Sequence, residues 1–93
     1  MSVEAVAARA TAQFEETLSQ LGRYLAIPAI SCEEAHFDDV RALAGVIRDD
    51  LASLGLENAR VLELDDALPC VAAEWTKAGP DAPTVLIYGH LDL

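Results

Sequence analysis

The sequence predicts an α/β fold with the element order α-α-β-β-β, and three observations support this prediction. In two segments of the N-terminal half, apolar residues recur every three or four positions, as they do along one face of an α-helix. The C-terminal half changes to shorter apolar runs of strand length, separated by turn residues. The chain has 93 residues, of which 53% are hydrophobic, so it can form the core of one small domain.

The first helix is expected over residues 3–25. Ser2 is suited to cap its N-terminus, because a serine hydroxyl can accept a hydrogen bond from a free backbone N–H of the first turn. Pro28 closes the segment, because proline disfavours helical dihedral angles at the residue before it. The apolar face of this helix consists of Val6, Ala10, Phe14, Leu18, Leu21 and Leu25.

The second helix is expected to begin at Glu34 or His36 and to end at Leu54. Ser31 and Glu34 have the spacing of a capping box, in which each residue satisfies a free N–H near the other. Gly55 follows the last periodic residue, as a left-handed residue just beyond a helix often does. The apolar stripe consists of Val40, Leu43, Ala44, Ile47, Leu51 and Leu54.

Three strands are expected after this helix. Residues 59–64 and 70–75 read as short strands joined by a turn, and the turn-rich residues 76–83 lead to a third strand at residues 84–88. This last run is continuously apolar and rich in β-branched residues, which is typical of a strand covered on both faces. Such a strand needs more neighbours than two helices and three strands supply. We therefore expect residues 1–93 to be the N-terminal part of a larger protein, with a small independent α/β domain as the alternative.

The charge balance excludes several classes of partner. Asp and Glu number 16 against 6 Lys and Arg, which gives a net charge of −10 and repels phosphate backbones and anionic lipids. No apolar run approaches the ~20 residues of a membrane span. Glu4 and Arg9 interrupt the alanine-rich N-terminus before a signal core can form. We expect a cytoplasmic protein that binds neither nucleic acid nor membrane. Cys32 and Cys70 are expected to be reduced, partly buried thiols, with a single disulfide between them as the alternative.

His90 and Asp92 follow the strongest predicted strand, at the end where open α/β sheets place their ligands. Residues two apart in an extended chain point to the same face, so both side chains are expected to project together, with Leu91 on the opposite side. A carboxylate that accepts one ring N–H of a histidine leaves the other nitrogen free for a metal. From spacing alone, a hydrogen-bonded turn histidine without metal is the alternative. Zinc also needs at least three protein ligands, so this pair would be only part of a site.

Other polar residues have simpler interpretations. His36 is expected at a solvated helix terminus, and the acidic pairs at residues 49–50 and 65–66 are expected on the solvated surface, because adjacent carboxylates do not converge on one point.

Three segments of the sequence resemble one enzyme family. LGRYLAIPAIS, DDVRALAGVIRDDLASLGLENARVLE and PTVLIYGHLDL are similar, in that order, to segments of the dizinc metallopeptidases of the carnosinase and cytosolic-dipeptidase type. That family includes carboxypeptidase G, aminoacylase and succinyl-diaminopimelate desuccinylase. The shared motifs are a helix ending in YLAIP-x-IS, a second helix ending in LGL, and a strand leading into YGH-x-D. The similarity extends from about Leu18 to Leu93, the opening fifth or so of a family member.

The resemblance implies a function for two residues. His90 would ligate one of two zinc ions, and Asp92 would orient that histidine and tune its basicity. Residues 1–93 would form the N-terminal part, with an incomplete sheet, of a zinc-peptidase-like three-layer α/β/α catalytic domain. Other parts of the family's site lie downstream: the bridging aspartate, the Glu-Glu pair with the general base, and the remaining ligands. Any dimerisation domain of the complete parent protein, which would be a homodimer, would also lie downstream. Leu93 stands where the family usually has valine.

The resemblance therefore implies a metal-dependent hydrolase that cleaves amide bonds of dipeptides or N-acyl amino acids. The 93-residue chain by itself is expected to be inactive, since it lacks most of the ligands. The alternative from a different class is a non-catalytic α/β module for binding or oligomerisation, whose last strand offers an edge to another chain.

Overall fold

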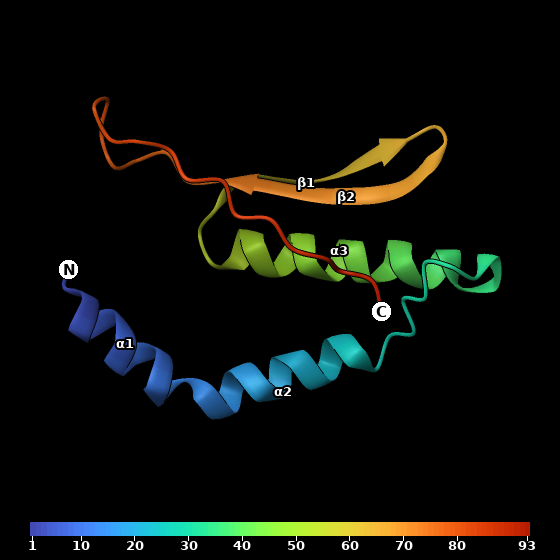
Figure 1. Cartoon of the computed structure of the whole chain (residues 1–93), viewed down its shortest axis with the longest axis horizontal. Helices are drawn as coiled ribbons and strands as arrows, with labels where there is room; N and C mark the ends of the chain where they lie inside the picture. Colours follow the sequence, from blue (N-terminus) through green and yellow to red (C-terminus); the bar gives the residue numbers. More distant parts are fainter.

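One helix and one hairpin form the centre of the fold in the computed structural model, which describes residues 1–93. Helix α3 (Phe37–Ser53) lies along a two-stranded antiparallel sheet made of β1 (Glu57–Leu64) and β2 (Ala67–Glu74) (Figure 1). Helices α1 (Val3–Ala12) and α2 (Phe14–Leu25) form an arm on the other side of α3. The predicted order of helices followed by strands is confirmed, as a small α+β fold with three helices and two strands.

The first predicted helix is divided in two. Ser2 caps α1 as expected, since its hydroxyl accepts a hydrogen bond from Ala5 N–H at 3.1 Å. The helix then breaks at Gln13, and α2 ends three residues before Pro28. The prediction of one continuous helix was therefore wrong. No residue of α1 or α2 is fully buried, so no packed face holds the two segments in one line.

Helix α3 ends as the sequence predicts. Gly55 has a φ of +92°, and its N–H donates to Ala52 O at 3.0 Å. The N–H of Leu56 donates to Leu51 O at 3.3 Å, which completes a Schellman motif. Its beginning differs from the prediction: a 3₁₀ turn η1 (Glu34–His36) precedes α3 and has no side-chain cap, so the capping box is not formed.

The hairpin agrees with the two expected strands. Val61 lies opposite Val71 and Leu62 opposite Cys70, and residues 65–66 make the turn. Bulges occur at both ends of β1. Both cysteines are free, but both are exposed, so the expectation of partly buried thiols was wrong.

The third predicted strand is not formed. Residues 84–88 have no sheet partner, and their apolar side chains face solvent, from 78% to 92% exposed, at Val85, Leu86, Ile87 and Tyr88. The prediction of a strand covered on both faces was wrong for this chain, because a strand needs the hydrogen bonds of a neighbouring strand and the sheet ends at β2. These residues instead run beside α3 as part of the final segment (Figure 1).

The core is small and lies on one face of α3. Val40, Leu43 and Ala44 are buried there together with Ala29, which follows α2. Partly buried apolar residues surround them: Tyr24, Ile27, Ile47, Leu68 and Leu91. The core therefore joins the end of α2, α3, the hairpin and the final segment at one place.

None of the helices has both the length and the apolar character that crossing a membrane requires.

A polar cluster attaches α2 to α3. Tyr24 donates its hydroxyl hydrogen to Asp50 Oδ2 at 2.5 Å, and Gln20 Nε2 donates to Tyr24 Oη at 3.1 Å and to Asp50 Oδ2 at 3.2 Å. Burial and the neighbouring Asp50 carboxylate raise the pKa of Tyr24 to about 12. The hydroxyl of Tyr24 and the amide of Gln20 lower the pKa of Asp50. Asp50 is therefore a bonded residue and not the solvated one expected from sequence.

Replacing Tyr24 by phenylalanine should lower the melting temperature by roughly 5 °C, since one hydrogen bond to a carboxylate is lost. The contribution of Tyr24 is fully present below pH 10, the usual pKa of a tyrosine, and is lost as pH rises toward about 12. The difference between the wild type and Tyr24→Phe should therefore shrink over that interval. Thermal unfolding followed by circular dichroism at several pH values measures it. Tyr88→Phe, at a tyrosine that is 80% exposed, is the control; equal effects of both variants would contradict the prediction.

Candidate functional site

The final segment is held against the loop that follows α2. Leu93 N–H donates to Ala29 O at 2.9 Å, and Leu91 packs against the core. Because the chain is extended here, Leu91 turns inward while His90 and Asp92 lie together on the other side. The predicted alternation of side chains is thus present although residues 84–88 form no strand.

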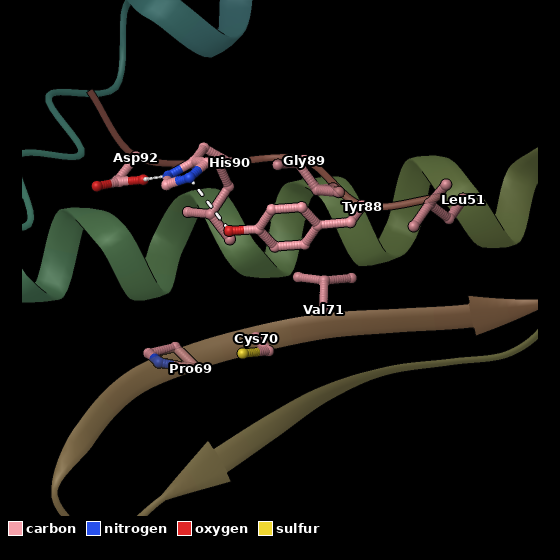
Figure 2. Close-up of a pocket in the computed structure, with 10 residues that line it drawn as sticks. Leu51, Pro69, Cys70, Val71, Tyr88, Gly89, His90 and Asp92 are labelled. Carbon is pink, nitrogen blue, oxygen red and sulfur yellow. Dashed lines mark hydrogen bonds and ion pairs between the residues drawn. The ribbon is translucent and has the colours of Figure 1, made fainter. Parts of the chain in front are cut away.

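Four polar side chains form a continuous hydrogen-bonded row at this place. His90 Nδ1 lies 3.2 Å from Asp92 Oδ1, and Tyr88 Oη lies 3.1 Å from His90 Nε2 (Figure 2). Ser31 donates its hydroxyl hydrogen to Asp92 Oδ2 at 2.5 Å. An ionised carboxylate can only accept, so the proton of the neutral imidazole is assigned to Nδ1 and Tyr88 donates to Nε2. We call these four residues, Ser31, Asp92, His90 and Tyr88, the polar row.

The row keeps its carboxylate ionised. The hydroxyl of Ser31 and, after it, the ring of His90 lower the pKa of Asp92. Both donors stabilise the charged form, which is the form that accepts the Nδ1 proton. The imidazole itself is 73% exposed, so solvent and solutes reach it.

An open cavity of about 440 Å³ lies beside the row, between α3, β2 and the final segment. Ile47 and Leu51 line it from α3, and Cys70 and Val71 from β2. Figure 2 shows the Tyr88 ring over this cavity, with its hydroxyl directed at the His90 imidazole. The ring planes of Tyr88 and His90 meet edge to face, at 66° with centroids 5.6 Å apart. The cavity is thus mainly apolar, with the imidazole at one end.

The residues present can supply one metal ligand at this place. The lone pair of His90 Nε2 accepts a hydrogen bond only from the hydroxyl of Tyr88, whereas both oxygens of Asp92 accept hydrogen bonds from Ser31 and from the ring itself. No group of three or more His, Cys, Asp or Glu side chains in the chain is arranged to hold a metal ion. The donor chemistry therefore fits one histidine ligand backed by a carboxylate, and a metal ion at this place would need its other ligands from elsewhere.

His36 is the second histidine and is placed differently. Its Nδ1 lies 2.9 Å from Asp39 Oδ2, and its Nε2 lies 3.7 Å from Glu33 Oε2. Glu33 and His36 lie at the 3₁₀ turn η1 and Asp39 in the first turn of α3, so His36 is at a helix terminus as the sequence predicts, although its side chain is only 30% exposed.

Sequence reasoning found His90 and Asp92 but missed their two partners. Tyr88 is two residues before His90, so the same alternation that pairs His90 with Asp92 could have identified it. Ser31 is 61 positions from Asp92, and no local pattern relates them.

Comparison with known proteins adds no relative. No protein-family model, no curated protein and no solved structure matches the chain.

Proposed function

We propose that this chain supplies a histidine ligand to the metal centre of a metal-dependent hydrolase, one that cleaves amide bonds of dipeptides or N-acyl amino acids. The observation that carries the proposal is the hydrogen bond between His90 Nδ1 and Asp92 Oδ1. It leaves Nε2 as the coordinating nitrogen of an exposed ring. The reaction and substrate class come from the resemblance of the YGH-x-D run and the two preceding segments to dizinc peptidases.

Three residues of the polar row have a role in this proposal. His90 presents Nε2 to zinc, Asp92 holds the proton on Nδ1, and Tyr88 must move its hydroxyl away from Nε2 before a metal binds there. Bound zinc would polarise the scissile carbonyl and lower the pKa of a water molecule. The other ligands and the proton-transferring glutamate would come from a continuation of the chain, which would also complete a three-layer α/β/α domain.

The exposed apolar surface supports such a continuation. Residues 84–88 form an uncharged run rich in β-branched residues, typical of a strand that pairs with neighbouring strands and has helices packed on both faces. The parent would be a cytoplasmic enzyme, homodimeric as the resemblance implies.

Zinc titration of the 93-residue protein tests the proposal. We expect zinc to shift the ring resonances of His90 in ¹H–¹⁵N spectra, and His90→Ala to weaken zinc binding at least ~10-fold. His36→Ala is the matched control and should leave the zinc-induced shift of His90 unchanged. A His90 ring that does not respond to zinc would contradict the proposal. The chain should hydrolyse no dipeptide even with zinc, because it supplies one ligand to the site.

A non-catalytic module for binding or oligomerisation is the second candidate, because Val85, Leu86, Ile87 and Tyr88 are exposed on an unpaired backbone. It predicts concentration-dependent association that Ile87→Lys reduces, together with no response of His90 to zinc. Sedimentation velocity at several concentrations separates the two candidates.

A further inference from the structure

We propose that Ser31 is a positioning residue that fixes the carboxylate of Asp92 and, through it, the tautomer and orientation of the His90 imidazole. The inference rests on the proposed function for its purpose, but its geometry is independent of any metal. Ser31 lies in the loop after α2, and Asp92 lies 61 positions later.

Two contacts between these segments define the geometry. The backbone bond from Leu93 N–H to Ala29 O, at 2.9 Å, holds the final segment beside the loop. The side-chain bond from Ser31 Oγ to Asp92 Oδ2 then ties the carboxylate itself. Because the backbone bond already holds the loop and the final segment together, the serine hydroxyl has to order only the side chain of Asp92. Its bond therefore acts on the direction of the carboxylate more than on the docking of the segment.

The imidazole depends on that carboxylate because little else holds it. The His90 side chain is 73% exposed, and its ring nitrogens contact only Asp92 and Tyr88. A carboxylate free to rotate would exchange its Nδ1 contact with water, and the proton would then distribute over both ring nitrogens. With Oδ2 bound to Ser31, Oδ1 remains directed at Nδ1. The proton is held there, and Nε2 keeps its lone pair.

The same hydroxyl was predicted to cap the second helix. The structure shows no side-chain cap on η1, so the hydroxyl of Ser31 is used at Asp92 instead. Ser31 is half-buried, and the Asp92 side chain is 30% exposed, so removing the hydroxyl does not leave a fully buried carboxylate without a partner. Ser31→Ala should therefore fold.

The test measures the tautomer of His90 by long-range ¹H–¹⁵N correlation in the metal-free protein, at one fixed pH where the ring is neutral. We expect wild type to show the proton on Nδ1, Ser31→Ala to show a clear increase of the Nε2–H form, and Ser31→Thr to restore the wild-type pattern. Zinc affinity should fall ~3- to 10-fold in Ser31→Ala and recover in Ser31→Thr. Ser53→Ala is the matched control, since that hydroxyl bonds the Asp50 carbonyl at the end of α3.

The exchange rate of the Leu93 amide, which reports docking of the segment, separates positioning from a structural role. Slow exchange in Ser31→Ala together with a changed tautomer supports positioning. Two results would overturn the positioning role: an unchanged tautomer in Ser31→Ala, or a changed tautomer accompanied by fast exchange of the Leu93 amide. If zinc fails to bind wild type while the tautomer still depends on Ser31, the proposed function fails and the positioning role stands.

Discussion

Replacing Leu43 by alanine is expected to destabilise the protein by roughly 2–4 kcal/mol, because it opens a cavity in the core. Leu43 is only 2% exposed and lies beside Val40 on the buried face of α3, which packs against Ala29. Partly buried apolar side chains surround it, among them Ile47 and Leu91, and they lose packing contacts when the leucine side chain is removed. A loss of this size is a large fraction of the total for a small domain, and the urea transition should shift to low concentration or disappear.

Equilibrium unfolding followed by far-ultraviolet circular dichroism measures this effect. Leu54→Ala is the matched control, because Leu54 follows α3 and is 73% exposed. We expect that substitution to change stability by about 0.5 kcal/mol or less. Similar losses in both variants would mean that the α3 face carrying Leu43 is not the one that packs.

Replacing Gly55 by alanine should cost roughly 1–2 kcal/mol, since the residue occupies a left-handed conformation. Its φ is +92°, and no atom would contact an added Cβ within 4 Å, so the cost is backbone strain and not steric overlap. Gly55 also donates the hydrogen bond to Ala52 O that ends α3, directly before β1. Weakening this hydrogen bond should loosen the connection between α3 and the hairpin.

The comparison for Gly55 is Gly22→Ala. Gly22 lies inside α2 with no atom close to an added Cβ, so alanine should be neutral or stabilising there by up to ~1 kcal/mol. Opposite signs for the two substitutions are the expected result in urea unfolding. A stabilising Gly55→Ala would contradict the assignment of a left-handed helix end.

The metal proposal depends on one short-range feature of the chain. His90 and Asp92 are two residues apart, and an extended backbone is enough to bring their side chains to one side. The pairing therefore survives although residues 84–88 have no strand partner. Ser31 is different, because its contact requires that the loop after α2 and the final segment meet across the core.

The sequence by itself determined the features that depend on neighbouring residues. The cap at Ser2, the end of α3 at Gly55, the two strands of the hairpin and the alternation that joins His90 to Asp92 all follow from local backbone preferences and from helix or strand periodicity. These preferences act over two to five residues, so they can be recognised in the order of the amino acids.

Only the tertiary structure decided which distant groups meet. The hydroxyl of Ser31 bonds Asp92 instead of a helix end, and Asp50 bonds Tyr24 instead of water, over separations of 61 and 26 positions. The exposure of residues 84–88 was also not predictable from their composition. A β-branched sequence indicates only that its side chains can be buried in a sheet. Whether they are buried depends on the elements that pack beside them.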